Sequence, residues 1–166
     1  MVEVAQLAGV SDTTVFNYFK TKVELLDAVI ESRSGTRDLA EQVDARPRDE
    51  KPFVALRRVL VEAGTPGEAL NAAAIKDLTR TVRADPALWG AQLRVGFQTA
   101  DQLAEAFSRR VRRSLSEQAR TAAYAFTASM IVVLEGLPED CTERDLKRRF
   151  NDLLDALSRA WPDLAT

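Results

Sequence analysis

The polar side chains best placed for chemistry lie near the start of the chain, on a short predicted helix from about residue 12 to residue 18. One edge of this helix carries polar side chains that its apolar face leaves free: Asp12, Thr13, Thr14 and Asn17. Hydroxyl, amide and carboxylate groups of this kind form hydrogen bonds with base edges and phosphates. The helix is roughly 10 Å long at 1.5 Å per residue, and a major groove about 12 Å wide accepts such an element. The segment therefore predicts a helix that reads DNA.

A second short helix must hold this element in place, and a tight turn must join the two. The turn is expected at Gly9, because glycine takes a positive φ without a steric clash at the end of a helix. Ser11 offers a hydroxyl that caps the following helix. The residues expected to share the inward face of that helix are Val15, Tyr18 and Phe19, which lie three and four positions apart. Two helices joined in this way form a helix-turn-helix, which places its second helix in the major groove.

The residues from 5 to 19 read AQLAGVSDTTVFNYF and are followed by Lys22, Leu25 and Leu26. This segment resembles the signature of the TetR (tetracycline-repressor) family of transcriptional regulators, A-x-x-A-G-V-S-x-x-T-V-F/Y-x-Y-F-x-x-K-x-x-L-L. The resemblance covers about the first 35 residues, and the rest of the chain matches the family only in architecture. It implies an all-α fold with two domains. Residues 1–36 would form a helix-turn-helix head with a connecting helix, and residues 50–166 a helical ligand-binding and dimerisation body.

The resemblance also implies roles for a set of polar residues that contact DNA: Ser11, Thr13, Thr14, Asn17, Tyr18 and Lys22. Thr13 and Thr14 match positions where family members touch phosphates and base edges. Asn17 faces the groove, where its amide can read adenine through paired hydrogen bonds. Tyr18 and Lys22 match residues that contact phosphate, and Lys22 is helped by the positive N-terminus of its own helix. The alternatives are that Asn17 is a solvated helix residue, that Tyr18 is mainly core and that Thr14 only stabilises the first turn.

Three features depart from the family pattern. Phe16 lacks the hydroxyl of the tyrosine that many relatives carry, and Asp12 puts a negative charge where phosphates would lie. In the family an amphipathic helix precedes the motif and covers it, whereas only three residues precede Val4 here. We therefore expect an N-terminally truncated head, through a start assigned too late or a lost segment, and weakened DNA binding.

Composition excludes several classes of function. The chain has no histidine, so Ser-His and Cys-His catalysis and His-ligated metals are excluded, and we expect no enzyme, cofactor or metal. The single Cys141 excludes an intrachain disulfide and suits a reducing cytoplasm; we interpret it as an inert small residue, with a redox-sensing thiol as the alternative. No long uncharged apolar run predicts a membrane span. With 23 Lys and Arg against 25 Asp and Glu, DNA binding is expected to be weak and salt-sensitive.

The rest of the chain predicts a series of helices separated by turn signals. A helix from Lys22 to about residue 34 should turn Val23, Leu26 and Ile30 inward, and residues 35–51, which are charged and contain Pro47, read as a linker. Further helices are expected from Pro52, from a capping box at residues 65–68, from residues 85–86 to about 111, and over residues 117–136 and 143–161.

The last two of these helices carry wide apolar faces, so we expect them to join a second copy in a four-helix bundle; the alternative is that they complete a monomer core. A charge at Phe126 or Leu154 should then break the dimer. Two-fold symmetry suits a palindromic operator.

Apolar side chains at helical spacing in the body predict a pocket for a small apolar or amphipathic effector, although such a stripe also suits plain core. Its candidate walls are Phe53, Leu56, Leu60, Ile75, Leu78, Trp89, Leu93, Phe97 and Phe126. The expected function is a cytoplasmic transcriptional regulator that binds DNA as a homodimer and acts as a small-molecule-responsive repressor. The alternative is a helical small-molecule-binding or dimerisation protein with a vestigial head.

Overall fold

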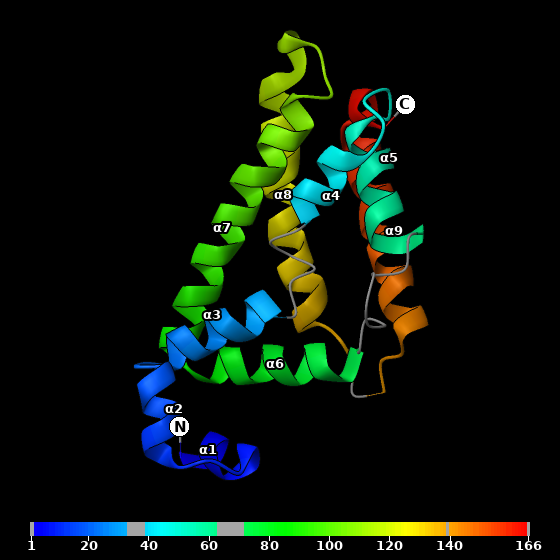
Figure 1. The fold of residues 1–166 in the computed structure, drawn as a ribbon. Coiled ribbons are helices and arrows are strands. Elements are labelled where there is room, and N and C mark those ends of the chain that lie inside the picture. The colour runs from blue at the N-terminus through cyan, green and yellow to red at the C-terminus, as the bar shows by residue number, and fades with distance from the viewer. Residues whose placement is uncertain (1, 33–38, 63–71, 139, 166) are drawn as a thin grey trace.

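The computed structural model describes residues 2–32, 39–62, 72–138 and 140–165. Every regular element in these ranges is helical and none is a strand, so the predicted all-α fold is confirmed. In chain order the helices are α1 (Val2–Ala8), α2 (Asp12–Tyr18), α3 (Lys22–Ser32), α4 (Leu39–Ala45), α5 (Pro52–Arg57), α6 (Ala72–Ala84), α7 (Pro86–Ser108), α8 (Ser116–Glu135) and α9 (Glu143–Ala160). Figure 1 shows α1 and α2 at one end of the molecule, while α7, α8 and α9 form the long axis of the body.

The turn between α1 and α2 has the predicted geometry. Gly9 has a φ of 66° and is the only residue with a positive φ in the described ranges. Val10 N donates to Ala5 O at 3.0 Å, which closes the end of α1. Ser11 Oγ accepts a hydrogen bond from Thr14 N at 3.1 Å and so caps α2. Because both signals act within a few residues, they could be recognised in the sequence.

The body is built around a long helical hairpin of α7 and α8, against which α9 packs. Its main core contains three fully buried aromatic rings, Phe53, Phe107 and Phe126. The Phe53 and Phe107 rings meet edge to face, with centroids 5.9 Å apart, which is a favoured arrangement of aromatic quadrupoles. A reciprocal capping box fixes the start of α9: Thr142 Oγ1 accepts from Asp145 N, and Asp145 Oδ2 accepts from Thr142 N, both at 3.2 Å.

A smaller apolar cluster joins the head to the body. Leu26 of α3 is buried against three residues of α6 and α7, namely Val82, Leu88 and Ala91. Val23, Leu78 and Trp89 pack at its margin. The predicted inward positions of α3 are therefore confirmed for Val23 and Leu26, whereas the side chain of Ile30 and the capping box expected at residues 65–68 lie outside the described part of the structure.

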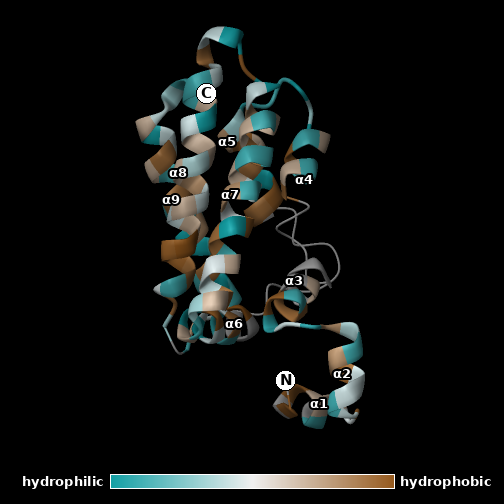
Figure 2. Ribbon diagram, turned by 90° about the vertical axis from the view of Figure 1, so that its left-hand side faces the viewer, coloured by the Kyte–Doolittle hydropathy of each residue, from teal (hydrophilic) through white to brown (hydrophobic). Residues whose placement is uncertain are grey.

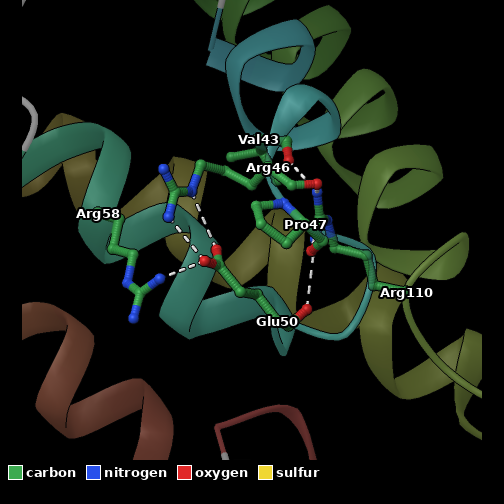
Figure 3. A network of polar contacts seen from close by, with 6 residues as sticks. All are labelled: Val43, Arg46, Pro47, Glu50, Arg58 and Arg110. Carbon is green, nitrogen blue, oxygen red and sulfur yellow. Dashed lines mark hydrogen bonds and ion pairs between the residues drawn. The ribbon is translucent and has the colours of Figure 1, made fainter.

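The linker expected over residues 35–51 was a wrong prediction in its described part. Leu39–Ala45 forms α4, with Leu39, Ala40 and Val43 buried in the main core. The helix forms because these three side chains share one face and pack into the main core. Its end is held by Arg110, which lies far along the sequence and is 8% exposed. Its guanidinium donates to Pro47 O at 2.7 Å, to Arg46 O at 2.9 Å and also to Val43 O (Figure 3).

These carbonyls follow or end α4, and two of them also accept a backbone hydrogen bond: Val43 O from Arg46 N at 3.2 Å and Pro47 O from Glu50 N at 3.1 Å. Arg110 bridges all three carbonyls and so fixes the turn between α4 and α5 against the end of α7. Next to this turn, the Glu50 carboxylate accepts hydrogen bonds from Arg46 at 2.6 Å and from Arg58 (Figure 3). The Arg46 hydrogen bond is the main reason that the pKa of Glu50 lies below its ordinary value.

Candidate nucleic-acid interface and ligand cavity

The outward edge of α2 is the candidate nucleic-acid interface. Thr13 and Asn17 are exposed and Thr14 is half-buried, while Val15, on the opposite edge, is 6% exposed. The predicted separation of a polar edge from an apolar edge is therefore present in α2. Ala5 of α1 is 1% exposed, because its small side chain lies where the two short helices cross.

Tyr18 was wrongly predicted to share the inward face with Val15 and Phe19. It is 78% exposed, whereas Phe19 is half-buried. The physical reason is that α2 ends at Tyr18 and Phe19 adopts an extended backbone, with φ −131° and ψ 106°. This change of direction turns the Phe19 ring inward and leaves the Tyr18 hydroxyl in solvent. A hydroxyl must be exposed in this way to contact a phosphate.

Two members of the predicted DNA-contacting set are engaged with each other. The hydroxyl oxygens of Ser11 and Thr14 lie 2.8 Å apart, in addition to the capping bond from Thr14 N. Either hydroxyl can donate in this pair, since both are donors and acceptors. The pair therefore holds the first turn of α2 in place and leaves lone pairs directed outward.

Lys22, the predicted phosphate ligand, contacts the body. Its ammonium Nζ lies 3.1 Å from Asp85 Oδ2. The other carboxylate oxygen of Asp85 caps α7 by accepting from Ala87 N at 2.9 Å. The hydrogen bond from Lys22 is the main reason that the pKa of Asp85 lies below its ordinary value. A single carboxylate thus connects the head to the longest helix of the body.

The start of α3 carries a second capping arrangement that the sequence reasoning missed. Thr21 Oγ1 accepts from Glu24 N at 3.1 Å, and the Glu24 carboxylate accepts from Lys20 N at 2.6 Å. The spacing of a threonine and a glutamate three residues later is a capping signal that could have predicted it. It anchors the segment between α2 and α3, and so the position of Lys22.

A cavity of about 240 Å³ opens between α6, α7 and α8. Four of the predicted wall residues line it, namely Leu60, Ile75, Leu78 and Trp89. The others lie elsewhere: Phe53, Leu56 and Phe126 are fully buried in the main core, Phe97 is 61% exposed, and Leu93 is half-buried outside the cavity wall. Helical spacing identified the buried faces but not which of them surround a void.

The cavity also has walls that the sequence reasoning did not select. Val82, Val95, Met130 and Ile131 add apolar surface, and Gln92, Thr99 and Thr127 add polar groups. Gly96 lies between Gln92 and Thr99 on α7; a Cβ there would meet Ile131 Cδ1 at 3.4 Å. The glycine therefore lets α7 and α8 approach closely beside the cavity.

The described residues contain no group of three or more His, Cys, Asp or Glu side chains that could hold a metal ion. None of the helices described is long and apolar enough to span a bilayer. In comparisons with known proteins, no family model and no curated protein matches this chain.

Proposed function

We propose that this chain is a DNA-binding transcriptional regulator of the TetR type, which binds a palindromic operator as a homodimer and responds to a small molecule. The observation that carries the proposal is the outward edge of α2, where Thr13, Asn17 and Tyr18 are exposed while Val15 is buried. A short helix that follows a glycine turn and presents hydroxyl and amide groups to solvent has the shape and chemistry for major-groove readout.

Pairing of two heads is supported by the apolar surface on one side of the body. Val132 of α8 is 67% exposed and Phe97 of α7 is 61% exposed. In Figure 2, α8 and α9 form one edge of the body and α4 lies at the opposite edge. A second copy packed on the α8 edge would cover this apolar surface and repeat the head by two-fold symmetry.

Response to a small molecule is supported by a wall shared between the cavity and the head. Val82, Leu78 and Trp89 line the cavity and also belong to the cluster that receives Leu26 of α3. A ligand that moves these side chains changes the packing of α3, on which the two short helices depend. The head would then have one position with the ligand bound and another without it. The ligand can change DNA affinity only by as much as it binds one of these positions more tightly than the other.

A second candidate function is a helical ligand-binding or dimerisation protein whose head does not bind DNA. It is favoured by the ion pair between Lys22 and Asp85, which engages the predicted phosphate ligand. The slight net negative charge of −2 also favours it, because cations supply much of the affinity for DNA.

The test is selection of bound sequences from a random duplex library, followed by fluorescence anisotropy on the selected site. We expect one selected half-site repeated by two-fold symmetry. Asn17→Ala should lose discrimination at one base pair of the half-site, at a cost of about 1–3 kcal/mol. Gln102→Ala truncates an exposed amide on α7, far from the head, and should leave the site preference unchanged. An equal loss on all sequences would refute base reading by Asn17, and no selected sequence at all would favour the second candidate.

A further inference from the structure

The cavity has almost no charge for a ligand to meet. Glu135 is the only charged side chain among its described walls, and its Oε1 lies 3.1 Å from Arg83 Nη1. The Arg83 guanidinium also lies over the Trp89 ring, 4.6 Å from the centroid. Both charges are therefore already paired at the rim, where the Arg83 side chain is 53% exposed.

One hydroxyl in the cavity wall lacks a hydrogen-bond partner. Thr79 donates to Ile75 O at 2.8 Å and Thr127 donates to Ala123 O at 3.0 Å, each one turn back along its own helix. Thr99 is 4% exposed, yet it forms no hydrogen bond with another residue of the described ranges. Its oxygen is not among the fully enclosed polar atoms of the described ranges that lack a partner, so the hydroxyl is reached from the cavity and is free to pair with a ligand.

Two other residues that line the cavity share a face of α7 with Thr99. Gln92 and Gly96 precede it by seven and three residues, so the three positions lie on one face of α7, and all three line the cavity. Val95 and Gly96 lie between the two polar side chains on this face, and because Gly96 has no side chain, only Val95 adds apolar bulk between the amide of Gln92 and the hydroxyl of Thr99. The remaining walls of the cavity are mainly aliphatic or aromatic.

We propose that this cavity binds an uncharged, mainly apolar molecule with one hydroxyl or carbonyl group, which pairs with Thr99 and Gln92. An ionised ligand would lose its hydration without gaining a free counter-ion. A pure hydrocarbon would leave Thr99 unpaired. Binding itself does not depend on the head; only its consequence for operator affinity depends on the proposed function.

The experiment compares three probes with the same ten-carbon chain: decanol, decanoate at neutral pH and decylammonium. Calorimetric titration of the purified chain measures affinity, and tryptophan emission of a Trp161→Phe variant, in which only Trp89 remains, reports contact with that ring. We expect decanol to bind saturably and about tenfold or more tighter than either ion, because only the ions must be buried with an uncompensated charge. Equal or tighter binding of either ion, or no binding of decanol, would overturn the proposal.

Thr99→Val removes the hydroxyl and retains the side-chain shape. We expect it to weaken decanol binding about fivefold to tenfold, while the melting temperature of the free protein stays the same or rises. The matched control is Thr121→Val, whose hydroxyl is bonded to Glu117 O at 3.0 Å within α8 and which does not line the cavity; it should leave decanol affinity unchanged.

Equal effects of the two variants would show that Thr99 has no special role and would overturn its assignment. Decanol binding in a protein that selects no DNA sequence would count against the proposed function alone.

Discussion

Lys22 Nζ and Asp85 Oδ2 lie 3.1 Å apart, and this ion pair joins the first residue of α3 to the residue that caps α7. Both side chains are partly exposed, at 63% and 28%, so the pair contributes little to stability. Its importance is positional, because it engages the ammonium group that the resemblance to TetR proteins assigns to DNA phosphate. A phosphate and the Asp85 carboxylate would compete for the same cation.

Asp85→Asn tests this competition. Asparagine caps a helix about as well as aspartate, so α7 should keep its start while Lys22 loses its partner. We expect DNA affinity to rise about twofold to tenfold, with a salt dependence that is steeper by up to one ion. The readout is fluorescence anisotropy at several salt concentrations. Asp77→Asn removes an exposed carboxylate that pairs with Arg80 on α6 and serves as the charge-matched control; an equal rise in both variants would mean that net charge alone is responsible.

Arg110 provides the second prediction. Arg110→Ala removes the guanidinium that bridges the carbonyls of Val43, Arg46 and Pro47, and we expect the free energy of unfolding to fall by about 3 kcal/mol. The neighbouring Arg109 has an exposed side chain that pairs with Asp44 at 3.1 Å, so Arg109→Ala should cost only about 0.5 kcal/mol. Chemical denaturation measures both. Similar losses in the two variants would contradict the role assigned to Arg110.

The Glu50 carboxylate gives a prediction about pH. Its pKa is lowered, mainly by the hydrogen bond from Arg46, so its charged form is the one that the folded state stabilises. The contribution is therefore complete above the unfolded pKa of about 4.3 and is lost as the pH falls through the lower folded pKa. Glu50→Gln should reduce stability at pH 7 and flatten the loss of stability as the pH falls below about 4.3. The measurement is denaturation at a series of pH values. If Glu50→Gln lost stability at acid pH as steeply as the parent protein, Glu50 would not be the group responsible.

The parts of the structure that could be predicted from the sequence are those fixed by near neighbours. The turn at Gly9, the Ser11 cap and the capping box of Thr142 and Asp145 each depend on residues within five positions. In contrast, the side chain that fixes the end of α4 is Arg110, more than sixty residues away from Val43. In the sequence, Arg110 looks like any other charged residue near a helix end.

The sequence does not show which distant residues meet in the fold, and this also explains the errors at the candidate sites. Helical spacing shows which side chains share a face, but not which other helix faces them. Trp89 and Phe97 both fitted the predicted apolar stripe, yet one lines the cavity and the other is 61% exposed. Tyr18 was misassigned for a local reason, because α2 ends at Tyr18 as expected but Phe19 has an extended backbone, so the two rings do not share one helical face.

The proposed dimer cannot be tested by placing a charge at Phe126 or Leu154, as the sequence suggested. Phe126 and Leu154 are fully buried in the monomer core, so a charge there would unfold the protein rather than separate two copies. Val132 is 67% exposed on the outer side of α8. If that side packs on a second copy, Val132→Glu buries an unpaired carboxylate from each copy and should weaken association by about 2 kcal/mol or more. Sedimentation velocity separates the species, with Ala45→Glu on the opposite edge of the body as the control for added charge (Figure 2). A dimer that survives Val132→Glu with its dissociation constant unchanged would exclude this side of α8 as the interface.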